Sequence, residues 1–90
     1  MTNAQLLVGS LSNDLFRVAT LTQRGSGAAA ERFLLESKRW AQQLVVSEEK
    51  KYIRNIAQEI VGLNEADLDL AQAERCLMQA ILLQNYSLHN

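Results

Sequence analysis

NEADLDLAQAERCLMQAILLQNY, residues 64–86, is the stretch with the densest run of large aliphatic side chains in this chain. At about 100° per residue, its apolar residues form two neighbouring faces of a helix. The first face holds Leu70, Ala73, Leu77, Ala80 and Ile81, and the second holds Leu68, Ala71, Met78, Leu82 and Tyr86. Only Gln72, Arg75 and Gln79 hold open a polar strip. A helix this apolar needs neighbours on more than one side, so the stretch predicts the central helix of an all-α bundle.

The rest of the chain supplies three more helical segments. We expect a single domain over residues 1–90, a four-helix up-down bundle with helices at about 3–24, 28–45, 48–61 and 65–86 and with short connections. Thr2 and Gln5 fit a capping box at the first helix start, and Gly25-Ser26-Gly27 stops that helix. Gly9 disfavours helix, so a start at Ser10 or Ser12 is the alternative. We expect two side chains to be well buried in the core. They are Leu77 in the last helix and Trp40 in the second helix.

The boundary between the second and third segments contains neither glycine nor proline. One continuous helix over residues 28–61 is therefore an alternative to two shorter ones. In a continuous helix, however, the apolar stripe after residue 50 would be rotated by roughly 140° from the one before it. A turn with Ser47 as N-cap and Glu48 and Glu49 in the first helical turn removes this conflict. At the next boundary, Gly62 ends the third helix and Asn64 caps the fourth.

Composition excludes several classes of protein. Hydrophobic residues make up 48% of the chain and charged residues 21%, which are the proportions of a folded globular domain. The net charge of −1 provides no bulk attraction to nucleic acid or to an anionic membrane. A single cysteine predicts a reducing cytoplasm, and the start, MTNAQLLVGS, lacks the basic region of a signal peptide. No run approaches the roughly 18 apolar residues of a membrane span.

Reactive and metal-binding side chains are sparse. Cys76 and His89 are the only soft metal ligands, and neither zinc-type pairs nor Glu-x-x-His pairs occur. A nucleophilic Cys76 would need a base, whereas a small buried thiol needs none. We therefore expect no enzyme activity, no metal, no cofactor and no small-molecule substrate.

Basic residues gather around the second and third helices. Arg32, Lys38, Arg39, Lys50, Lys51 and Arg54 form a possible ridge, and such cations would bind a phosphate backbone with steep salt dependence. Glu31, Glu36, Glu48 and Glu49 are interspersed, however, which is typical of a solvated face with local ion pairs. Nucleic-acid binding through Arg32, Arg39, Lys50, Lys51 and Arg54 is therefore the alternative function rather than the leading one.

The leading hypothesis is a small helical protein–protein interaction module that acts as a homodimer or as the partner of a larger protein. The observation behind this hypothesis is an excess of apolar surface, because the last helix has two apolar faces and a bundle helix needs only one. With the first face inward, Met78, Leu82 and Tyr86 reach the surface, and Phe16 of the first helix is a further candidate contact. A dimer would complete the bundle by covering this patch. The alternative is that the first and second helices cover both faces within one chain.

Overall fold

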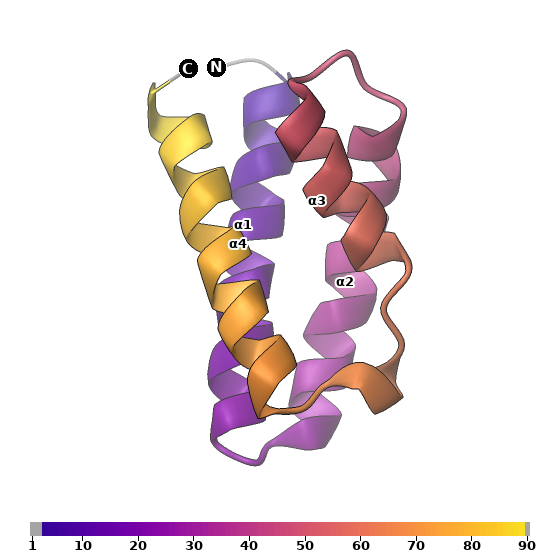
Figure 1. Cartoon of the computed structure of the whole chain (residues 1–90), viewed down its shortest axis with the longest axis vertical. Coiled ribbons are helices and arrows are strands. Elements are labelled where there is room, and N and C mark those ends of the chain that lie inside the picture. The colour runs from indigo at the N-terminus through magenta and orange to yellow at the C-terminus, as the bar shows by residue number, and fades with distance from the viewer. Residues whose placement is uncertain (1–2, 90) are drawn as a thin grey trace.

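The computed structural model describes residues 3–89, and these residues form α-helices and one turn of 3₁₀ helix without a strand. The α-helices are α1 (Asn3–Gln23), α2 (Gly27–Val45), α3 (Lys51–Val61) and α4 (Leu70–His89), and the 3₁₀ turn is η1 (Glu65–Asp67) (Figure 1). The prediction of an all-α chain is confirmed. Thr2, the expected cap of α1, and Asn90 lie outside the described residues.

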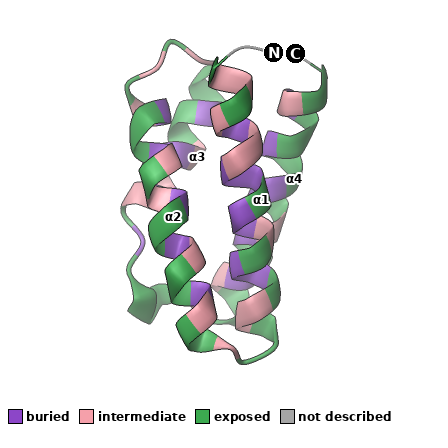
Figure 2. Cartoon of the chain, turned by 180° about the vertical axis from the view of Figure 1, so that it is seen from behind, coloured by how far each residue is buried: buried purple, intermediate pink, exposed green. Residues whose placement is uncertain are grey.

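The helix with the most extensive packing is α1, not α4 as the sequence predicted. α1 packs along α4 on one side and along α2 on the other, and α3 packs on α2. The start of α1 and the end of α4 lie at the same end of the molecule (Figure 1). Buried residues recur along α1 at helical spacing, and Figure 2 shows them facing the other helices. The fully buried aliphatic residues of α1 are Val8, Leu11, Leu15 and Val18.

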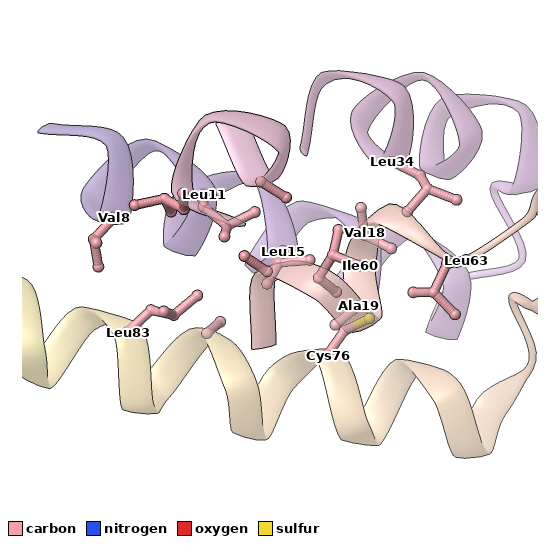
Figure 3. Close-up of a cluster of buried hydrophobic side chains, with 14 of the residues drawn as sticks. Val8, Leu11, Leu15, Val18, Ala19, Leu34, Ile60, Leu63, Cys76 and Leu83 are labelled. Carbon is pink, nitrogen blue, oxygen red and sulfur yellow. The ribbon is translucent and has the colours of Figure 1, made fainter. Parts of the chain in front are cut away.

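The core lies between α1, α2, α3 and α4, and its side chains come from every helix. Figure 3 shows Leu11, Leu15 and Val18 of α1 in this cluster with Leu34, Ile60, Leu63, Cys76 and Leu83. These residues are almost completely withdrawn from solvent. Trp40, which the sequence predicted to be well buried, is only half-buried and packs at the edge of the cluster.

The contact between α1 and α4 is close because the facing residues are small. The Ser12 hydroxyl of α1 donates a hydrogen bond to the Ala80 carbonyl of α4, with 2.8 Å between the oxygens. Nearer the chain ends, a Cβ added at Gly9 would lie 3.3 Å from the Ser87 Oγ. α1 therefore includes Gly9 and begins at Asn3, as one of the two alternatives predicted, and the glycine makes room for α4.

Two of the three chain reversals follow the sequence closely. After α1, Gly25 adopts a φ of +79°, and the Ser26 amide donates to the Leu21 carbonyl at 2.8 Å. This is the helix-terminating pattern that a left-handed glycine permits. The break between α2 and α3 is also present, so one continuous helix over residues 28–61 is excluded.

The role predicted for Ser47 is wrong. α3 begins at Lys51 rather than at residue 48. The Ser47 hydroxyl donates to the Leu44 carbonyl at 2.7 Å and accepts the Glu49 amide at 3.3 Å, so it closes the end of α2. Glu48 and Glu49 consequently lie in the connection, from which Glu49 reaches α4.

The start of the fourth segment also differs from the prediction, because it contains two helix starts. Asn64 caps η1 as expected, and its amide donates to the Asp67 carboxylate at 2.8 Å. The Asp69 carboxylate then accepts a hydrogen bond from the backbone amide of Gln72 at 2.8 Å. Since each of these acids satisfies its own helix start, the chain turns between them and α4 begins only at Leu70. At its other end α4 extends to His89, past the predicted end at Tyr86.

Candidate functional site

Within residues 3–89, α4 carries more exposed large hydrophobic residues than any other helix. Met78, Ile81 and Leu82 are 49%, 45% and 43% exposed, and half-buried Leu77 lies beside them. These four residues and Glu74 line one hollow of about 270 Å³. Leu70 and Leu88, near the two ends of the helix, are exposed as well. We call the set Leu70, Leu77, Met78, Ile81, Leu82 and Leu88 the outer stripe.

The inner side of α4 combines three small residues with three larger ones. It comprises Ala73, Cys76, Gln79, Ala80, Leu83 and Tyr86. The sequence predicted that Leu70, Leu77 and Ile81 would face the core together with Ala73 and Ala80. That prediction is wrong for the three large residues, because α4 is turned by roughly one residue step, about 100°, from the expected orientation. The turn brings alanine and cysteine toward α1 and allows the close contact between the two helices.

Of the predicted partner contacts, Met78 and Leu82 lie on the outer stripe but Tyr86 does not. Tyr86 is buried, and its hydroxyl donates a hydrogen bond to the Glu49 carboxylate. This bond, reinforced by burial, raises the pKa of Tyr86 to about 12. The ring also meets Tyr52 edge to face, with centroids 6.2 Å apart. Tyr86 therefore joins α4 to α3 and its preceding turn and is not available to a partner.

A polar edge separates the outer stripe from α3. Glu59 of α3 accepts two hydrogen bonds from the Arg75 guanidinium, each 2.8 Å long, and a third from the Gln79 amide. The Arg75 hydrogen bonds hold the pKa of the Glu59 carboxyl below its usual range. Gln79 is consequently buried, although the sequence placed it on the exposed polar strip. The pairing also directs Arg75 toward α3, so that Glu74 is the charged residue left in the middle of the outer stripe.

Phe16 lies on a different part of the surface. With Leu21, Phe33 and two arginines it lines a hollow of about 330 Å³ between α1 and α2. Arg17 stacks over Phe33, 5.2 Å from the ring centre, and pairs with Asp14 at 3.3 Å. The Trp40 ring nitrogen donates to the same buried carboxylate at 2.8 Å. The structure thus places Phe16 in a hollow beside this α1–α2 network and does not bring it together with Met78 and Leu82.

The cations of the alternative function are all exposed. Arg32 and Arg39 lie on α2, whereas Lys50, Lys51 and Arg54 lie at the start of α3. None of the five forms an ion pair within residues 3–89. Acids accompany them, since Glu36 lines the same hollow as Arg32 and the Arg54 guanidinium donates to the Glu49 carbonyl at 3.0 Å. The surface around them is mixed in charge.

Cys76 lies in the core and has the surroundings of a structural thiol. It is fully buried, and the Gln72 amide nitrogen lies 3.6 Å from its sulfur. Burial raises the pKa of the thiol, which keeps it protonated. Within residues 3–89, no three side chains of His, Cys, Asp or Glu gather as a metal site would require.

The helices of the described chain are each too short or too polar to cross a membrane. Comparisons with protein families, with curated proteins and with solved structures give no match to this chain.

Proposed function

We propose that this chain is a small helical protein–protein interaction module, acting as a homodimer or as the partner of a larger protein, with the outer stripe of α4 as its contact surface. The observation that carries the proposal is the outer stripe itself, a row of large apolar side chains on the water-facing side of α4, while Ala73, Cys76 and Ala80 face the core beside Leu83 and Tyr86. Exposed, contiguous apolar patches on small folded proteins mark sites of association. Burying them contributes roughly 25 cal/mol per Å² of apolar area to a complex, against which the entropy lost on association must be set.

The architecture that we infer is an up-down four-helix bundle. It is supported by the pairwise packing of α1 with α4, of α1 with α2 and of α2 with α3, and by the start of α1 and the end of α4 lying at one end of the molecule. In such a bundle each helix turns one side inward, which leaves the outer stripe for a partner. The single buried thiol is consistent with a reducing cytoplasm as its location.

Sedimentation equilibrium at micromolar concentration tests the homodimer. We expect a dimer for the wild type and a monomer for Met78→Glu with Leu82→Glu, because burying two carboxylates against apolar surface is unfavourable. Leu35→Glu with Val46→Glu is the matched control, since both residues are exposed and apolar but lie outside α4. A dimer that survives the α4 changes and dissociates with the control would place the interface elsewhere.

If the wild type sediments as a 10.1 kDa monomer, the homodimer is excluded and binding to a larger protein remains as the proposed role. Pull-downs from native extract, with the wild type and the Met78→Glu, Leu82→Glu variant as paired baits, test that form. A protein retained by the wild type and the Leu35→Glu, Val46→Glu control but lost by the α4 variant would support it. Identical retention by all three would contradict it.

The alternative, a nucleic-acid-binding regulator, is favoured by the five exposed cations that have no acidic partner within the described chain. A salt titration against nonspecific duplex tests it. Binding at 50 mM salt that weakens steeply with added salt, and weakens further on Lys50→Gln with Lys51→Gln, would support the alternative. No binding at about 50 mM salt would remove it.

A further inference from the structure

The exposed positions of α4 form a seam with the spacing of a coiled coil. Leu70, Glu74, Leu77, Ile81, Gln84 and Leu88 are separated by steps of four, three, four, three and four residues. This is the alternation of a and d positions in a heptad repeat. Five of the six residues are exposed, and Leu77 is half-buried. α4 has 20 residues and so extends for about 30 Å, which is nearly the 34 Å length of the molecule.

This seam is symmetric about residue 79. Leu77 and Ile81 lie two residues to either side, Glu74 and Gln84 five residues, and Leu70 and Leu88 nine residues. A stripe that reads alike in both directions is self-complementary when two copies are related by a twofold axis perpendicular to the helix. Each a position then packs against a d position of the other copy, so that aliphatic side chains meet aliphatic ones and Glu74 meets the neutral Gln84 amide.

Charge selects between the two possible directions. In a parallel pair, every seam residue would face its own copy, and Glu74 would lie against a second Glu74 in an otherwise apolar interface. Like charges in such positions are destabilising. In an antiparallel pair, the Gln84 amide can donate a hydrogen bond to the Glu74 carboxylate at each end of the interface. Arg75 does not disturb either arrangement, because Glu59 holds it on the side of α3.

We infer that the partner of the outer stripe is a second copy of this chain, bound with its α4 antiparallel and with the twofold axis crossing the seam at the level of residue 79. The inference rests on the proposed function and names its partner and register. Met78, on the flank of the seam, then lies close to its own copy across the axis, where its flexible side chain fills the space between the helices. Leu70 of each copy contacts Leu88 of the other.

Disulfide trapping distinguishes the directions. In a Cys76→Ala background, Leu70→Cys alone and Leu88→Cys alone should not cross-link, because equal residues lie about 27 Å apart along antiparallel helices. A mixture of the two proteins should form the mixed 70–88 disulfide on oxidation. Cross-linking of Leu70→Cys with itself would overturn the antiparallel register. A wild type that is monomeric throughout would overturn the second copy as partner, while the paired pull-downs decide the proposed function separately.

A charge change provides a second readout that does not depend on trapping. Gln84→Lys would place a cation opposite Glu74 twice in the antiparallel dimer, and we expect its dissociation constant to fall by about twofold to tenfold. In a parallel dimer the same change opposes two lysines, so the constant would rise. Gln42→Lys on the exposed face of α2 is the matched control and should leave the constant unchanged. An equal effect of both substitutions, or a rise with Gln84→Lys, would overturn the inferred register.

Discussion

The two sides of α4 are both apolar but differ in where the small residues lie. The side toward α1 contains Ala73, Cys76 and Ala80 beside the larger Gln79, Leu83 and Tyr86, whereas only large aliphatic residues make up the outer stripe on the side toward water. Small residues let two helix backbones approach, as the 2.8 Å bond from Ser12 to the Ala80 carbonyl shows. Hydrophobicity alone therefore does not say which face of an apolar helix is internal. The position of the small residues carries that information here, and the large residues of the outer stripe remain free for association.

The largest expected difference between the two sides of α4 is in the stability lost when a side chain is truncated to alanine. Leu83 is fully buried, so Leu83→Ala should lower the free energy of unfolding by roughly 2–5 kcal/mol. Ile81→Ala on the outer stripe should cost less than about 1 kcal/mol in the monomer. Urea denaturation measures both. Met78→Lys with Leu82→Lys serves as a common background, so that dissociation does not contribute. Equal losses for the two variants would contradict the assignment of sides.

An intermediate effect tests the close approach of α1. Ala80→Leu adds three carbons where the Ser12 hydroxyl reaches the α4 backbone, and overpacking of this kind should cost about 1–3 kcal/mol. Ala71→Leu makes the same change at an exposed position of α4 and should be nearly neutral. Thermal unfolding in the same background compares the two. If Ala80→Leu proved as stable as Ala71→Leu, the space between the helices would be larger than the structure shows.

Much of the fold follows from patterns visible in the sequence. The apolar periodicity, Gly25 and the change of phase near residue 47 are local signals, and they correctly predicted an all-α chain and most helix ends. The orientation of α4 was not predictable in this way, because its apolar residues cover two faces and either could pack inward. What decides it is a set of contacts between segments far apart in the chain, such as Ser12 with Ala80 and Tyr86 with Glu49.

The candidate site was therefore only partly predictable. Met78 and Leu82 are exposed, as expected with the first face inward, because they also lie outside the face that packs on α1. Tyr86 was misplaced because its polar partner is contributed by a connection, and Leu77 and Ile81 were missed because they were assigned to the core. The one sequence signal for the correct orientation was the concentration of Ala73, Cys76 and Ala80 on a single face. Asp14 is a sequence signal for a different contact, the one between α1 and α2. A carboxylate among the apolar positions of α1 needs a hydrogen-bond donor, and Trp40 of α2 provides it.

The smallest expected effect concerns the polar edge between the two sides, where Glu59 holds Arg75 and Gln79. The folded state lowers the Glu59 pKa below its ordinary value of 4.5. The interaction therefore stabilises the protein above about pH 4.5, and its contribution is lost as the pH falls through the lowered pKa. Both partners are substantially exposed, so the contribution at pH 7 should be below about 1 kcal/mol.

Glu59→Gln should consequently lower the free energy of unfolding at pH 7 by that small amount, and the difference from the parent should close as the pH is lowered to about 3. Glu48→Gln, which removes an exposed carboxylate that forms no ion pair within residues 3–89, is the matched control and should show little difference at either pH. The lysine background suits this measurement because its added charges do not titrate in this range. A deficit of Glu59→Gln that stayed constant from pH 7 to pH 3 would mean that shape rather than charge holds this edge. The orientation of α4 would then depend on its small inner residues alone.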